Sequence, residues 1–111
     1  MAEPTLADVF GAGATQDATT LTILKSDLAG LGLTAASGNT AESLFISIVL
    51  KAAGLLTEVN RLTDTANRNI AIEFAGADIF NDGLGNDFLR RAWSVSAYVD
   101  YTLPTFDPDD V

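Results

Sequence analysis

The chain has 111 residues, 48% of them hydrophobic, and a formal net charge of −9 from 15 acidic and 6 basic side chains. It contains neither cysteine nor histidine, which excludes a disulfide framework, a thiolate nucleophile, an imidazole base and the usual zinc sites. This length predicts a single domain over residues 1–111 with a modest core. The negative charge argues against nucleic acid and anionic membranes as partners, because both would be repelled.

The N-terminal segment predicts a flexible arm over residues 1–18, with a short helical turn from Pro4 to Phe10, since proline suits the first position of a helix. It lacks a basic region followed by a long apolar run, so we expect no signal peptide and a cytoplasmic or virion-associated location. The longest apolar stretch, Leu44–Leu56, is too short to span a bilayer, which argues against a membrane protein.

The first strand is predicted at residues 19–25, TTLTILK, where Leu21 and Ile23 alternate with threonines. A glycine-rich loop follows over residues 26–38. Its leucines are expected to anchor it to the core.

Residues 39–62 carry the strongest helical pattern of the chain. Asn39 is expected to cap this helix, with Glu42 three residues on as in a capping box. Gly54 costs about 1 kcal/mol relative to alanine in a helix interior, so a break there is compatible with the pattern. The wide apolar face fits the centre of a monomer core and equally a contact with a second subunit. It comprises Ala41, Phe45, Ile48, Ala52, Leu55, Val59 and Leu62.

Two further strands are predicted at residues 68–75 and 90–102, where apolar side chains alternate with small or polar ones. We expect them to form a hairpin with an extended loop at 76–89, and strand 19–25 to join its edge. The predicted fold is α+β. One main helix packs on a small, mostly antiparallel sheet, with extended N- and C-terminal arms, the second being the acidic tail at 103–111.

Residues 73–89, EFAGADIFNDGLGNDFL, resemble the nonapeptide calcium repeat of RTX proteins, whose pattern is G-G-x-G-x-D-x-U-x. Residues 82–90 match it except that an aspartate replaces the first glycine. Three carboxylates are therefore candidate calcium ligands, because hard cations prefer oxygen: Asp78, Asp82 and Asp87. That family stacks several repeats, whereas the blocks flanking this segment contain no glycine. The residues favour a hairpin loop in which Gly, Asp and Asn supply positive φ and backbone caps.

Catalytic chemistry is weakly indicated. The same three aspartates fit a carboxylate-based hydrolase by residue type, but no cluster of aromatic side chains for a carbohydrate lies nearby. Trp93 fits a core position better than a ligand platform. Arg90 and Arg91 would lie on opposite faces of their strand, which argues against a joint phosphate clamp.

Residues 21–45, LTILKSDLAGLGLTAASGNTAESLF, together with FDPDD at 106–110, resemble small uncharacterised proteins associated with phage or prophage-type structural genes, and suggest a cyanobacterial origin. The resemblance implies a structural or assembly role and brings no catalytic motif. We therefore expect a non-enzymatic protein that forms a homo-oligomer, with other protein subunits as further partners and no cofactor. The alternative is a small calcium-binding or protein-interaction module that uses residues 76–87.

Overall fold

The computed structural model describes residues 3–101 and 108–110. It confirms the α+β class, because short helices combine with two separate antiparallel sheets of two strands each. Most of the predicted acidic tail at 103–111 lies outside the described residues. In chain order the elements are α1 (Leu6–Phe10), β1 (Thr15–Gln16), β2 (Leu21–Thr22), the 3-10 helix η1 (Lys25–Leu31), α2 (Ala41–Ala53), α3 (Glu58–Thr63), β3 (Ile70–Asn81), β4 (Asp87–Ala97) and the 3-10 turn η2 (Pro108–Asp110).

The helical turn predicted near the N-terminus is confirmed by α1, which a capping box begins. The Thr5 hydroxyl accepts the Asp8 N–H, and the Asp8 carboxylate accepts the Thr5 N–H. After α1 the chain folds back on η1, because Gly11 adopts a φ of +112° and Gly13 donates its N–H to Asp27. Because α1 and η1 both contact α2, residues 6–13 are part of the packed unit.

The predicted strand 19–25 differs from the structure. Only Leu21 and Thr22 are extended, and they pair with β1 instead of the main sheet. The Asp17 carboxylate accepts the N–H groups of Thr19 and Thr20, both at 2.8 Å, and so closes a tight turn between the two strands. The chain then enters η1 at Lys25, which ends the strand before it can reach another edge.

The single helix predicted at 39–62 is two helices, α2 and α3, with a break at 54–57. Gly54 ends α2, and the Thr57 hydroxyl caps α3 by accepting the Asn60 N–H. Within the break, the Leu56 carbonyl accepts the Ile72 N–H at 2.6 Å, so this segment is hydrogen-bonded to β3. The predicted Asn39 cap is also wrong. Thr40 caps α2, while the Asn39 side chain closes the preceding loop through Thr34 and Ala36.

The apolar face expected along the helix is only partly buried. Phe45, Val59 and Leu62 are exposed, whereas the small residues Ser47 and Ala52 are buried. The Ser47 hydroxyl donates to the Ser43 carbonyl, which satisfies its polar group inside the packed region. On α2 the buried positions are therefore small residues, whereas the bulky Phe45 of α2 and Val59 and Leu62 of α3 are left outside the core.

A long hairpin dominates the second half of the chain. β3 and β4 pair from Ile70 opposite Ala97 to Asn81 opposite Asp87, so the predicted loop at 76–89 is mostly strand and only residues 82–86 form the turn. The register shifts once, between Phe74 and Gly76, where Ala75 is the extra residue of a β-bulge. Gly76 has a φ of +111°, which suits it to this irregular position.

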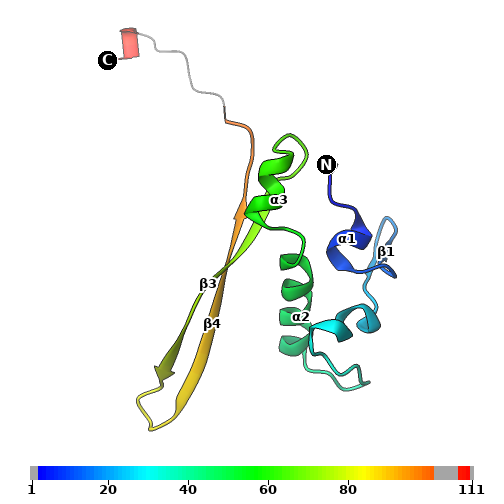
Figure 1. Cartoon of the computed structure of the whole chain (residues 1–111), viewed down its shortest axis with the longest axis vertical. Helices are drawn as coiled ribbons and strands as arrows, with labels where there is room; N and C mark the ends of the chain where they lie inside the picture. Colours follow the sequence, from blue (N-terminus) through cyan, green and yellow to red (C-terminus); the bar gives the residue numbers. More distant parts are fainter. Residues whose placement is uncertain (1–2, 102–107, 111) are drawn as a thin grey trace.

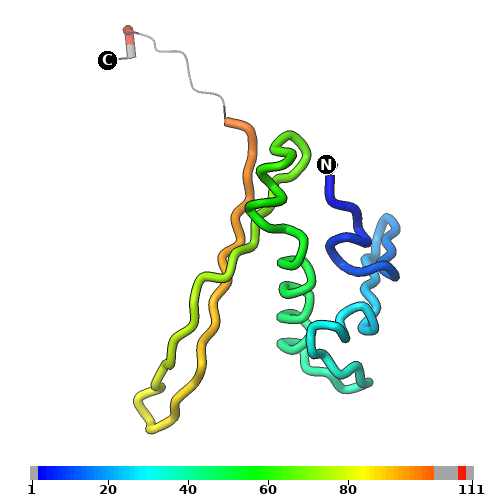
Figure 2. The backbone as a smooth tube through the Cα atoms, viewed as in Figure 1, coloured from blue at the N-terminus to red at the C-terminus, as the bar shows by residue number. Residues whose placement is uncertain are grey.

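The hairpin projects from the rest of the molecule. Figures 1 and 2 show it diverging from α2, with its turn as the end farthest from the helices. The Cα radius of gyration is 19.1 Å, whereas a compact chain of this length has about 13 Å. The buried hydrophobic residues are correspondingly few and small or medium in size: Leu28, Leu33, Ala52, Ala71 and Ile72. None of the helices in the described ranges is long and apolar enough to cross a membrane.

The hairpin is anchored at its base, where β3 contacts α3 and α2 (Figure 1). The Arg61 guanidinium lies 3.4 Å from the centre of the Tyr98 ring, and the Tyr98 hydroxyl donates to Glu58 at 3.1 Å. The Glu73 carboxylate accepts the Glu58 N–H at 2.7 Å, at the beginning of α3. Figure 1 shows the end of the hairpin near its turn projecting away from the helices that the structure describes.

Candidate interaction surface

The two faces of the projecting hairpin differ in composition. The pairing register and the alternation along β4 place Phe74, Ile79, Leu89, Trp93 and Val95 on one side, which we call the apolar face, together with Ala77, Arg91, Asn81 and Asp87. The other side, the polar face, carries Glu73, Asp78, Phe80, Phe88, Arg90 and Ser94. The bulge is what brings Phe74 and Ile79 to the same side, because residues five apart in an unbroken strand point to opposite sides.

The apolar face is open to solvent along most of its length. Ile79 is 73% exposed, Val95 62%, Leu89 61% and Phe74 57%. The Phe74 and Trp93 rings meet edge to face with centroids 5.6 Å apart, which fixes the two largest side chains relative to each other. Monomeric proteins rarely leave several bulky apolar side chains grouped on one uncovered surface. This face is therefore the strongest candidate for a contact with another molecule.

The polar face is held together within the chain. The Arg90 guanidinium makes two hydrogen bonds to the Asp78 carboxylate, at 2.8 and 2.5 Å, and lies 5.5 Å from the Phe80 ring centre. The hydrogen bond from Arg90 lowers the pKa of Asp78. Both groups are more than half exposed, so the pair orients side chains more than it stabilises the fold.

The turn at 82–86 is organised by Asp82. Its carboxylate accepts the Asn86 side-chain amide at 2.9 Å and the Leu84 N–H at 2.7 Å, and these bonds lower its pKa. Gly83 and Gly85 both adopt positive φ, which the tight turn requires. The hairpin-loop interpretation of this glycine-rich segment is confirmed for residues 82–86.

The three candidate calcium ligands lie in different settings. Asp78 is on the polar face and bonded to Arg90, Asp82 is in the turn, and Asp87 is on the apolar face, where it accepts the Asn81 side-chain amide at 2.7 Å. Over the part of the chain that the structure describes, no three His, Cys, Asp or Glu side chains form a group that could hold a metal ion. The calcium site stays a prediction, and the same spread gives no geometry for a carboxylate-based hydrolase.

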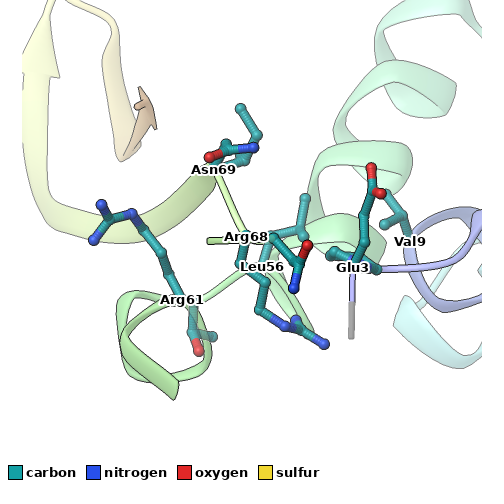
Figure 3. A pocket seen from close by; sticks show the side chains of 10 residues that line it. Glu3, Val9, Leu56, Arg61, Arg68 and Asn69 are labelled. Carbon is teal, nitrogen blue, oxygen red and sulfur yellow. The ribbon is translucent and has the colours of Figure 1, made fainter. Parts of the chain in front are cut away.

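A cavity of about 190 Å³ lies at the base of the hairpin, where the N-terminal segment meets α3 (Figure 3). Figure 3 shows Arg61 on one side of it and Glu3 and Val9 on the other. Arg68 is only 6% exposed, and its Nε has no hydrogen-bond partner. Arg61 also has a buried, unbonded Nε, but its Nη1 bonds Glu58 at 3.2 Å.

Comparison with known proteins adds no relative. No family model matches the chain, and no curated protein and no solved structure matches it. The candidate surface therefore has to be interpreted from its own geometry.

The predicted strands already contained Phe74, Trp93 and Val95, whereas the loop predicted at 76–89 left out Ile79 and Leu89. The signal was present in β4, where Leu89 continues the alternation of Trp93 and Val95 toward the turn. In β3 the bulge hid it, since the extra residue interrupts the period of two.

Proposed function

We propose that the protein is a non-enzymatic assembly subunit, which forms a homo-oligomer through the β3–β4 hairpin and belongs to a virion-like structure. The exposed apolar face of the hairpin carries the proposal. It combines four largely exposed bulky side chains with the partly covered Trp93.

The marginal stability of an isolated two-stranded hairpin supports this function. Isolated hairpins are marginally stable in water, and three or more strands or a packed layer are needed for independent stability. Among the residues that the structure describes, neither covers the distal part of β3 and β4, and the outer edge of each strand is unpaired along the sheet. A neighbouring subunit would supply the missing layer.

Composition agrees with a non-enzymatic role, because the chain offers no histidine or cysteine for acid–base or nucleophilic chemistry. The net charge of −9 opposes self-association, so specific contacts have to outweigh this repulsion. The resemblance of residues 21–45 to phage-type structural proteins agrees with an assembly role and with other protein subunits as partners.

The test is the solution mass of the full chain by light scattering over a range of concentrations. We expect a mass above the 11.6 kDa of one chain. The double variant Ile79→Thr/Leu89→Thr should lower it toward the single-chain value, because threonine keeps strand propensity but removes apolar surface. A monomeric wild type would contradict the homo-oligomer.

The matched control is Phe80→Thr/Phe88→Thr on the polar face, which removes apolar groups from the adjacent cross-strand pair, one step nearer the turn. It should leave the mass unchanged. If this control dissociates the oligomer and the apolar-face variant does not, the wrong side of the hairpin has been assigned.

A further inference from the structure

The apolar face contains one cation without a partner. Arg91 lies between Leu89 and Trp93 on that face, is exposed, and makes no hydrogen bond or ion pair with any residue that the structure describes. Its neighbour Arg90 is bonded to Asp78 on the other side of the strand. A purely hydrophobic partner on the apolar face would bury the Arg91 charge without a counter-charge. The desolvation cost of that charge would exceed the free energy gained from the apolar contact.

The same face also carries an acceptor that suits this cation. Asp87 lies four residues nearer the turn on β4, and the Asn81 amide holds its carboxylate in place at 2.7 Å while leaving further lone pairs free to accept. The two residues are about 13 Å apart along the strand, at 3.3 Å per residue, so they do not pair within one chain. Leu89 lies midway between them, opposite Ile79 on β3.

We propose that the occupant of the apolar face is the apolar face of a second copy, stacked with the two hairpins antiparallel, so that Arg91 of each copy pairs with Asp87 of the other. This inference rests on the proposed self-association and specifies its geometry. A two-fold axis that crosses the hairpin at the Leu89–Ile79 pair generates the arrangement.

That axis makes the surface self-complementary. It sets Leu89 against Leu89 of the second copy and Ile79 against Ile79, with one Arg91–Asp87 pair on each side. Stacked sheets lie about 10 Å apart, a gap that an arginine side chain reaching toward a carboxylate can bridge. The turn of each copy then lies over the Phe74–Trp93 pair of the other, where Leu84, 84% exposed, adds an apolar contact.

The opposite orientation, with both turns at the same end, fits the charges poorly. Its two-fold axis runs along the strands and exchanges β3 with β4, which places Arg91 over Ala77 of the second copy. No carboxylate faces the guanidinium there, and the two Arg91 cations lie near each other. Charge thus selects the antiparallel register, which is the usual role of ion pairs in an interface.

The size of the surface sets the expected strength. From the turn to Trp93 the overlap is about eight residues long and two strands wide, on the order of 300 Å² per copy, against about 800 Å² for a standard stable interface. We therefore expect weak association that becomes detectable only as the concentration of the chain is raised.

Charge reversal in the full chain provides the test, with sedimentation velocity as the readout. Arg91→Asp and Asp87→Arg should each weaken self-association by about ten-fold or more, because like charges then face each other. The double variant R91D/D87R should restore it to within a few-fold of wild type. The control D78R/R90D swaps the ion pair of the polar face and should leave association unchanged.

Cross-linking gives a readout that is independent of charge. The chain has no cysteine, so Leu89→Cys introduces a single thiol beside the proposed axis, and a short bis-maleimide should join two chains there. Phe88→Cys, one residue away on the polar face, should remain uncross-linked.

The outcomes separate the two proposals. A wild type that stays monomeric overturns both the proposed function and this geometry. An oligomer that the double swap fails to restore, or in which Phe88→Cys cross-links better than Leu89→Cys, overturns the geometry and leaves self-association standing.

Discussion

The carboxylate of Glu73, in the third position after the hairpin begins to pair, accepts the backbone N–H of Glu58 at the first residue of α3, at 2.7 Å. A strand side chain thereby satisfies a helix N-terminus that lies fifteen residues earlier in the chain. The Glu58 N–H has this acceptor only when the hairpin lies against α3. The contact therefore couples formation of α3 to attachment of the hairpin.

Replacing Glu73 with alanine should destabilise the protein by about 1 kcal/mol, the usual cost of losing a side-chain cap at a helix N-terminus. Urea unfolding and amide hydrogen exchange at Glu58 measure the effect. Glu73→Gln keeps an acceptor oxygen and should recover part of the loss. Equal stability of the alanine variant and wild type would mean that the cap contributes nothing in solution.

Gly11→Ala should be among the most damaging single-methyl additions. A Cβ there would lie 2.4 Å from the Cβ of Asp27, and the φ of +112° is unfavourable for any residue with a side chain. We expect a loss of about 1–3 kcal/mol in unfolding free energy. Gly38→Ala is the matched control, since nothing lies within 4 Å of its added methyl and its φ is not in the left-handed region. The two variants behaving alike would contradict the close packing of residues 11–13 on η1.

The β1–β2 turn should respond to acid. Hydrogen bonds from the backbone N–H groups of Thr19 and Thr20 lower the pKa of Asp17 from 3.8 to about 2. Because the folded state holds this proton less tightly than the unfolded state, the stabilisation is present above pH 3.8 and is lost as the pH falls through 2. An NMR titration should show the Thr19 and Thr20 amides shifting with a midpoint near pH 2, and Asp17→Asn should abolish the transition. A midpoint at the ordinary aspartate value would show that the turn is open in solution.

Arg68→Met should raise stability. Arg68 is 6% exposed with an unbonded Nε, so its charge is buried at a cost that a methionine of similar shape avoids. Its positive charge makes only a minor contribution to the low pKa of Asp8, which comes first from the hydrogen bonds with Thr5. We expect a gain of about 1 kcal/mol, or an increase in Tm of about 4–8 °C for a domain of this size. A fall in Tm would indicate that the guanidinium finds a partner in solution.

Millimolar calcium should leave both the oligomer mass and the melting temperature unchanged. Asp78, Asp82 and Asp87 each accept a hydrogen bond from within the hairpin, and they lie on its two faces and in its turn. A ligand that binds only the folded state raises its melting temperature, so a calcium-dependent increase would revive the calcium-module alternative. Asp82→Asn would then identify the site if it removed the increase.

The sequence was informative where local rules govern the outcome. The α+β class, the N-terminal helical turn and the existence of a hairpin in the second half followed from periodicity and turn residues. The break between α2 and α3 could not be predicted in this way. It depends on the Thr57 hydroxyl capping α3 and on the Leu56 carbonyl accepting a hydrogen bond from β3. Those partners are fixed by tertiary contacts that no local pattern contains.

The candidate surface likewise has features that local sequence predicts and features that depend on tertiary structure. The turn built by Asp82 could be predicted, because aspartate and glycine make such turns from their own chemistry. The pairing of Asp78 with Arg90 and the isolation of Arg91 could not, since they require the strand register. One inserted residue sets that register.

Ala75 is the extra residue that shifts the alternation of side chains along β3 by one position. Because the bulge leaves Ala75 out of the alternation, every later residue of β3 lies on the side opposite to the one that it would occupy in an unbroken strand of the same sequence. Deleting this one alanine would remove the bulge and still leave Ile79 on the side of Trp93 and Asp78 on the side of Arg90, because Phe74 and Ile79 would then lie four residues apart in a regular strand. The bulge thus gives β3 a local irregularity at Ala75 while each face keeps the side chains that a regular strand one residue shorter would place there.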